Sequence, residues 1–317
     1  HYLNKIMFYN RHPNLLHNIL DTGAFYFFCF CFSLFWWVEY VSLFFSTPIC
    51  FFLILSLGVS HGALDHIKGK KVLKFFNIKN MLFFYVFYVM ISFITLLSWY
   101  FLPTITLSIF LLVASYHFGK EDSEIMKFKR SFFSLVIFLV KGSLVITAPL
   151  FFQFNETVSI FNLLNFNIDF LIRINDEGII KFIFYLSLLS NIYFLIESCR
   201  YNFFFIIADL LSINILFYLL SPLAAFTLYF CFIHSFRHSV SLIKSLDKRD
   251  FKKGLKKFVI RAFPLTATTA FLFLISVYFI GNYYTLDESI SQVIFIGLAS
   301  LTFPHILLEY LLKKNEK

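Results

Sequence analysis

Charged residues are scarce in this chain of 317 residues. They make up 14% of the sequence, whereas soluble domains contain about 25%. The hydrophobic share is 59% and the mean hydropathy is +0.78. Many stretches reach the roughly 17–25 apolar residues that a helix needs to cross a bilayer. The composition excludes an ordinary soluble domain and predicts an all-α, polytopic transmembrane helical bundle.

Several patterns that carry chemistry elsewhere are also missing. The five cysteines fall in or beside apolar segments without a Cys-x-x-Cys pair, which argues against a disulfide framework or a cysteine zinc site. The His-Glu-x-x-His motif of zinc proteases is absent, as is the adjacent histidine pair of di-iron desaturases. No glycine-rich nucleotide motif is present. These absences leave the nine histidines as the main candidates for chemistry.

The apolar pattern predicts about ten spans, with eight as an alternative, in a single integral membrane domain over residues 1–317. The predicted spans are 23–40, 45–66, 81–101, 104–119, 131–151, 179–197, 203–220, 222–243, 259–281 and 289–311. The 49 Phe and 17 Tyr residues are compatible with an aromatic-lined cavity, and a coding bias explains them equally well.

Basic residues fall almost entirely on one side of these ten spans. The opposite side receives only Arg173, in the long connection 152–178. This asymmetry predicts an even number of spans, cytoplasmic termini and a multi-pass protein of the cell (inner) membrane. Topology and contact with anionic membrane lipid then explain the net charge of +9, and no nucleic-acid partner is expected.

Five histidines fall at similar depths near the cytoplasmic ends of predicted spans: His61, His117, His234, His238 and His305. An ionisable side chain in hydrocarbon costs several kcal/mol, so a shared function is expected. His234 and His238 are four residues apart on one predicted helix face, about 5–6 Å from each other, which one metal ion can bridge. His61 and His117 complete a mononuclear four-imidazole site. Imidazole suits iron, zinc and copper. The alternative is that these histidines only bond backbone carbonyls and pack helices.

Carboxylates follow three of the histidines at a spacing of four residues. The pairs are His61 with Asp65, His117 with Glu121, and His305 with Glu309. Each carboxylate is expected to accept the second ring N–H of its histidine, and Arg237 to neutralise one of them. Glu121 and Asp122 are also compatible with a solvated loop, and so is His66. The outer set predicted around the metal consists of Asp65, His305, Glu309, Arg237 and Tyr116.

At these residues the chain resembles the Brp/Blh family of bacterial and archaeal β-carotene 15,15′-dioxygenases. The shared motifs are Gly-x-x-His-Gly-Ala-Leu-Asp-His from Gly58 to His66, His-Phe-Gly with following acidic residues from His117 to Asp122, His-x-x-Arg-His from His234 to His238, and Pro304-His305 followed by Glu309. The resemblance covers about residues 58 to 310.

The resemblance implies an enzyme that binds one iron, Fe(2+), and uses O2 to split the central double bond of all-trans-β-carotene into two all-trans-retinal molecules. By motif matching, the catalytic iron ligands would be His61, His117, His234 and His238. No nicotinamide or flavin is called for. The resemblance also implies a functional link to a microbial rhodopsin. The competing class is a non-catalytic membrane carrier of carotenoid or retinal, or a rhodopsin assembly factor.

The depth of the predicted metal site constrains how such a substrate lies. β-Carotene is about as long as the bilayer hydrocarbon is thick, ~30 Å, whereas the histidines lie within roughly 5–15 Å of one membrane face. Central cleavage then requires an oblique substrate in a tunnel that opens laterally to lipid. Candidate lining residues are Tyr116, Phe118, Phe232, Phe236 and Phe303, with ordinary helix packing as the alternative.

Overall fold

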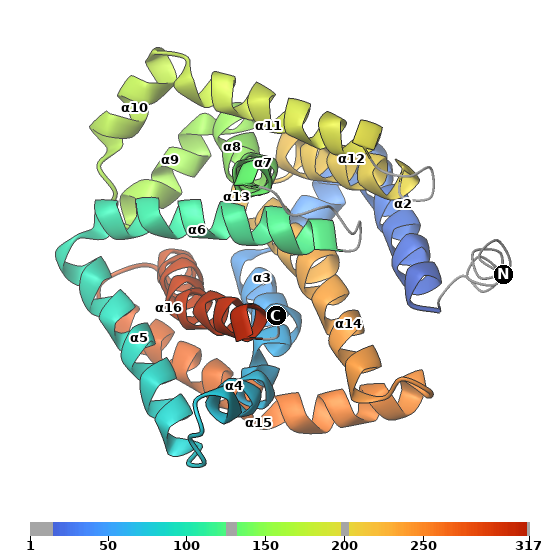
Figure 1. Ribbon diagram of the computed structural model, residues 1–317. Coiled ribbons are helices and arrows are strands. Elements are labelled where there is room, and N and C mark those ends of the chain that lie inside the picture. Colours follow the sequence, from blue (N-terminus) through green and yellow to red (C-terminus); the bar gives the residue numbers. More distant parts are fainter. Residues whose placement is uncertain (1–14, 125–131, 198–202, 316–317) are drawn as a thin grey trace, which may run out of the picture.

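The computed structural model describes residues 15–124, 132–197 and 203–315, and every element in these ranges is helical (Figure 1). In chain order the elements are α2 (Leu15–Phe44), α3 (Thr47–Leu53), η1 (Ile54–Gly58), η2 (Val59–Leu64), α4 (Asp65–Phe75), α5 (Leu82–Phe101), α6 (Pro103–Glu124), α7 (Phe132–Gly142), α8 (Leu144–Phe152), α9 (Phe154–Leu163), α10 (Ile168–Asp176), α11 (Ile179–Glu197), α12 (Phe203–Leu219), α13 (Pro222–Leu228), η3 (Tyr229–Ser235), α14 (Phe236–Leu246), α15 (Phe251–Ile280) and α16 (Leu286–Asn315). The predicted all-α class is confirmed.

Seven helices in the described ranges are long and apolar enough to cross a membrane, which confirms a polytopic membrane protein. The other predicted spans are 104–119, 203–220 and 222–243, and they are helical as well. However, α6 ends in a charged turn, α12 has only 17 residues, and the last of the three is divided into α13, η3 and α14. The count of ten crossings, the single domain and the cytoplasmic termini stay predictions.

Proline and polar residues fix where several helices begin. Pro48 and Pro222 occupy the first turns of α3 and α13, where the missing N–H of proline costs no helical hydrogen bond. Asp250 caps α15 by accepting from the backbone N–H groups of Lys252 and Lys253, at 2.9 and 3.1 Å. α15 therefore starts at a defined residue, and it later forms one wall of the cavity.

The regular α-helical hydrogen bonding is interrupted at two histidine motifs. η1 is a π-helix that leads into the 3-10 segment η2, which carries His61. η3 is a second π-helix and contains His234. Single π turns inside α-helices recur at functional sites, because the inserted residue changes the direction of the side chains that follow.

α16 lies in the middle of the bundle in Figure 1. It packs against α3, α4, α5, α6 and α15. α6, which carries His117, and α4, which carries Asp65 and His66, therefore both pack against α16, which contributes His305 and Glu309.

α6 and α7 cross backbone to backbone because both have glycine at the crossing. A Cβ atom on Gly119 would lie 1.9 Å from the carbonyl oxygen of Phe138, and one on Gly142 would lie 1.9 Å from that of Ser115. No larger residue fits this crossing without separation of the helices. The crossing holds the end of α6 that carries His117.

Candidate metal centre

Three buried histidines from three helices form one cluster. His117 on α6, His234 on η3 and His305 on α16 are exposed by only 4%, 2% and 5%. The ring centroid of His117 lies 5.2 Å from that of His234 and 5.5 Å from that of His305. Two imidazoles that bind one ion through metal–nitrogen bonds of about 2.0–2.1 Å place their centroids roughly 5 Å apart. Each of these two separations is compatible with a shared ion. Among the described residues, the donor atoms that lie within 4.8 Å of one another belong to two overlapping groups, His238, His305 and Glu309, and His117, Glu121 and Glu309.

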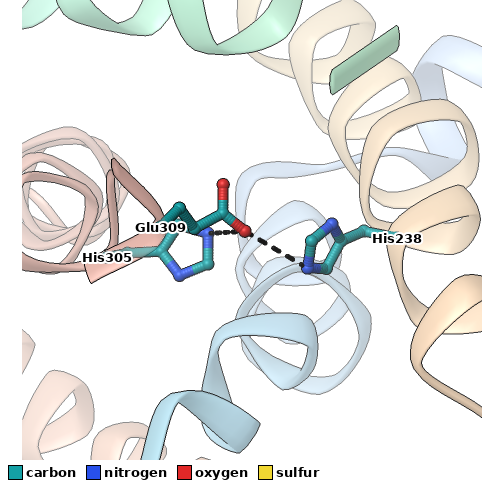
Figure 2. Close-up of side chains that lie close together, drawn as sticks. All are labelled: His238, His305 and Glu309. Atoms are coloured by element: carbon teal, nitrogen blue, oxygen red, sulfur yellow. Dashed lines mark ion pairs between the residues drawn. The ribbon is translucent and has the colours of Figure 1, made fainter. Parts of the chain in front are cut away.

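His238 on α14 approaches the cluster from the other side. Its ring centroid lies 6.0 Å from that of His305. Figure 2 shows both rings around the carboxylate of Glu309, and the candidate donor atoms of these three residues lie within 4.8 Å of one another. The Nδ1 atom of His238 lies 3.7 Å from the carboxylate of Glu121.

His61 completes the predicted ligand set, but its side chain lies outside the described part of the structure. Its backbone belongs to η2, which packs against η3 and α14. The structure thus brings together three of the four predicted ligands, His117, His234 and His238. The assignment of all four as metal ligands stays a prediction.

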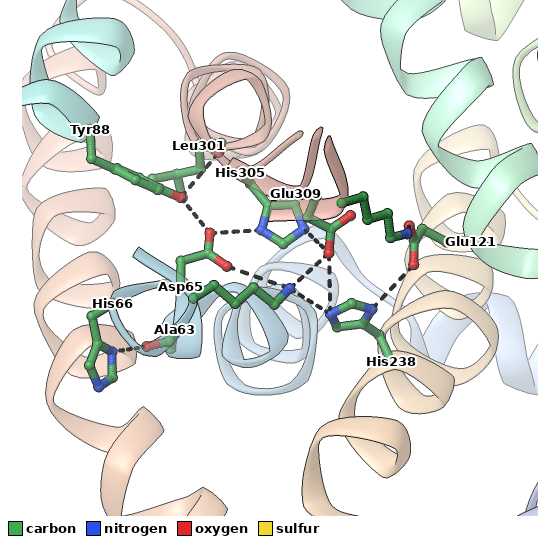
Figure 3. A network of polar contacts seen from close by, with 11 residues as sticks. Ala63, Asp65, His66, Tyr88, Glu121, His238, Leu301, His305 and Glu309 are labelled. Atoms are coloured by element: carbon green, nitrogen blue, oxygen red, sulfur yellow. Dashed lines mark hydrogen bonds and ion pairs between the residues drawn. The ribbon is translucent and has the colours of Figure 1, made fainter. Parts of the chain in front are cut away.

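Asp65 has a partner on another helix that the spacing did not predict. Figure 3 shows His305 Nδ1 donating to Asp65 across 2.7 Å, and the Tyr88 hydroxyl donating to the same carboxylate oxygen across 3.0 Å. Glu309, the predicted partner of His305, lies 3.8 Å from the other ring nitrogen, Nε2. The prediction for His305 is therefore corrected: Asp65 reaches across from α4 and takes its N–H.

Asp122 forms a second arrangement of the same kind. Its carboxylate lies 3.5 Å from His234 Nδ1 and accepts a hydrogen bond of 2.9 Å from the Tyr229 hydroxyl. α6 continues to Glu124, so Glu121 and Asp122 belong to a helix and face the protein interior. The interpretation of these two carboxylates as loop residues is wrong.

Lys68 is a member of the site that the sequence interpretation missed. Its ammonium donates to Glu309 Oε1 across 2.8 Å and to His238 Nε2 across 3.3 Å. The predicted span ends at residue 66, before Lys68, but α4 extends to Phe75. The spacing contained a signal, because His61, Asp65 and Lys68 follow the i, i+4, i+7 pattern of one helix face.

A mostly apolar cavity of about 620 Å³ meets the cluster and is bordered by His117, His234 and His305. Its walls come mainly from α5, α15 and α16. Val89 and Leu272 also line it, and their side chains are exposed by 64% and 55%, so the cavity reaches the outer surface between α5 and α15. Its volume falls within the ~300–1,000 Å³ that small-molecule sites occupy.

Of the five predicted lining aromatics, only Phe118 borders this cavity. Tyr116 contacts Phe138 and lies below the Lys120 ammonium, and Phe303 packs against Phe110. Phe232 stacks on Phe27, and Phe236 packs close to Gly23. Residues one or two positions from a histidine are rotated by about 100° or 200° around the helix, so most of them face other neighbours.

The family model described as β-carotene 15,15′-dioxygenase matches residues 52–313. The chain belongs to this family. One relative, named β-carotene 15,15′-dioxygenase, from the uncultured marine bacterium 66A03, is 30% identical over 259 residues, which cover 81% of this chain and 90% of the relative. No solved structure matches the chain. The resemblance inferred from the histidine motifs is confirmed.

The donor atoms of the cluster fit the iron that the family resemblance implies. Imidazole nitrogen suits iron, and carboxylate oxygen from Glu121 and Glu309 lies within reach of His117. The Glu309 Oε2 atom is buried and has no hydrogen-bond partner among the described residues. A bound cation would satisfy that oxygen, since a buried acceptor without a partner is costly.

Arg237 does not neutralise the carboxylates predicted to surround the metal. Its guanidinium forms two hydrogen bonds with Asp209 of α12, one of them 2.7 Å long, and lies 4.1 Å from the ring centre of Phe205. One residue before His238, it lies about 100° around the helix from that histidine and faces α12. The pair joins α14 to α12 within the bundle.

We expect Arg237→Met to destabilise the protein by roughly 3 kcal/mol, because the variant leaves Asp209 as an uncompensated charge in a site that is largely buried. Denaturant unfolding in detergent micelles measures the loss. The double variant with Asp209→Leu is the control, and it should recover most of the stability. A single variant as stable as the wild type would refute a structural role for the pair.

Proposed function

We propose that this protein is a β-carotene 15,15′-dioxygenase of the cell membrane, which uses O2 to convert all-trans-β-carotene into two all-trans-retinal molecules. Family membership and the name of the relative support this proposal. The observation that carries it is the junction between a largely apolar cavity and a buried histidine cluster. A hydrocarbon substrate and a metal would meet at that junction.

Iron, Fe(2+), would be held by the histidine cluster, and the ligand set implied by the resemblance is His61, His117, His234 and His238. When bound, iron supplies the redox chemistry that lets O2 react with an electron-rich double bond. The polyene itself provides the electrons, so the reaction needs no nicotinamide or flavin.

The residues around the cluster fix the orientation of its rings. Asp122 faces His234 Nδ1 and Asp65 accepts from His305 Nδ1, and in metal sites such carboxylates set which ring nitrogen carries the proton. Lys68 balances the charge of Glu309. Phe118 and Phe230 line the cavity beside His234 and exclude water from it.

The dimensions of the cavity agree with central cleavage. Along α16 it extends from Gln292 to His305, which is roughly 20 Å at 1.5 Å per residue. Half of a molecule as long as the ~30 Å hydrocarbon core measures about 15 Å. One half of β-carotene would therefore lie in the cavity with its central bond near the histidines.

The test is an assay of the purified protein in detergent with all-trans-β-carotene, in air and under nitrogen. We expect bound iron and about two retinal molecules per β-carotene consumed, with product only in the presence of O2. Retinal is quantified by chromatography. Iron-loaded protein that binds the carotenoid without forming retinal would favour the carrier function. The link to a microbial rhodopsin stays a prediction.

A further inference from the structure

We propose that His305 binds the metal directly, together with His238 and Glu309. The sequence places His305 only in the outer set, and the proposal rests on the iron site of the proposed function. The contacts of both ring nitrogens, the distances to the other imidazoles and the position of the ring at the cavity carry the inference.

The hydrogen bond to Asp65 fixes which nitrogen of His305 faces a metal. An ionised carboxylate only accepts hydrogen bonds, so the 2.7 Å contact places the ring proton on Nδ1. In a neutral imidazole the lone pair then lies on Nε2. This nitrogen lies 3.8 Å from Glu309 Oε1, on the side of the ring that faces the other candidate ligands (Figure 2).

The environment of His305 repeats that of His234, a ligand expected from the motifs. In each case an aspartate lies near Nδ1, 2.7 Å from that of His305 and 3.5 Å from that of His234, and a tyrosine hydroxyl donates to the aspartate. The two sets are Tyr88, Asp65 and His305, and Tyr229, Asp122 and His234. Metal-binding histidines almost always have such a carboxylate or carbonyl partner on the second nitrogen. The similar partners indicate the same role for both histidines.

The distances place His305 among the described ligand candidates. Its ring centroid is 5.5 Å from that of His117, close to the roughly 5 Å expected for two imidazoles on one ion. Its donor atom lies within 4.8 Å of those of His238 and Glu309. A histidine that only oriented a ligand would be separated from the metal by that ligand. The ring of His305 instead lies beside those of both His117 and His238.

The cavity provides an independent observation. His305, His117 and His234 all border it. A metal that reacts with a substrate in this cavity must be held by residues at its boundary. His66 also borders the cavity, but its Nδ1 donates to the Ala63 carbonyl across 3.0 Å (Figure 3). His66 therefore offers a matched control, a cavity histidine engaged with the backbone.

Cobalt(II) titration of the metal-depleted protein in detergent tests the proposal, because it reports ligation without any activity. We expect His305→Gln and His305→Ala to lower cobalt affinity by more than about 100-fold, since loss of an outer partner alone costs ~10–100-fold. The visible cobalt spectrum should change in any complex that remains. His66→Gln should retain the affinity and spectrum of the wild type.

Asp65→Asn provides a second variant in case the His305 variants fail to fold. Asp65→Asn and Asp122→Asn should weaken cobalt binding to a similar degree, about 10–100-fold. Wild-type affinity and spectrum in His305→Gln, or in Asp65→Asn if His305→Gln aggregates, would overturn the proposal. Failure of this proposal can be distinguished from failure of the proposed dioxygenase function. If only the dioxygenase function is wrong, the wild-type protein binds cobalt through His305 but forms no retinal.

Discussion

Alanine at His117 or His234 is expected to remove most of the bound iron and to lower retinal formation by more than about 100-fold. Loss of a residue that orients a metal ligand typically lowers metal affinity or activity ~10–100-fold, and loss of the ligand itself lowers them further. The 5.2 Å between the two ring centroids is the geometric basis of the prediction. The motif-based set extends the same expectation to His61 and His238.

Iron content and retinal yield should be measured on the same purified samples. Ser108→Ala is a suitable control for His117→Ala, because Ser108 lies on the same helix and its hydroxyl donates to the Thr104 carbonyl within that helix. The control should keep both iron and activity. Full iron occupancy in two or more of the four histidine variants would refute the ligand assignment.

The helical class and the convergence of the histidines were predictable, because both depend on position along a helix. Scarce charge and long apolar runs predict spanning helices, and equal depth predicts that histidines from different spans share one layer. His117, His234 and His305 do lie together. These inferences need only the rise per residue and the end of each apolar run.

The hydrogen-bonded partners were not predictable from the same spacing. A spacing of four residues describes neighbours on one helix, whereas His305 bonds Asp65 from α4, and Arg237 bonds Asp209 from α12. Such pairs depend on which helices become neighbours, and the sequence of a single helix does not contain that information. The π-helix η3, which contains His234, was not predicted either.

Lys68 illustrates a different limit. A run of lysines after an apolar segment is typical of a loop at the membrane surface. The segment from Lys68 to Lys79 contains five lysines, and nothing in the run itself distinguishes the first from the other four. The helix continues through this run, so one lysine turns inward to Glu309 while Lys70 and Lys71 remain exposed. If the helix is continued past Asp65, Lys68 falls on the same helix face as Asp65, and this would have distinguished Lys68 from the other lysines.

Gly119→Ala is expected to destabilise the protein by more than about 4 kcal/mol, a loss reached only through a few mechanisms such as severe overpacking. The added Cβ would lie 1.9 Å from the Phe138 carbonyl oxygen, and a backbone atom cannot turn aside as a flexible side chain can. α6 and α7 must therefore separate. Because His117 lies two residues away on α6, iron binding should fall together with stability.

Denaturant unfolding and iron content in detergent measure both effects of Gly119→Ala. Gly281→Ala is the matched control: its Cβ would lie 3.1 Å from the nearest atom, the Val277 carbonyl oxygen, so a shift of a few tenths of an ångström accommodates it. This control should unfold within about 1 kcal/mol of the wild type. Wild-type stability and iron content in Gly119→Ala would mean that the α6–α7 crossing does not hold His117 in place.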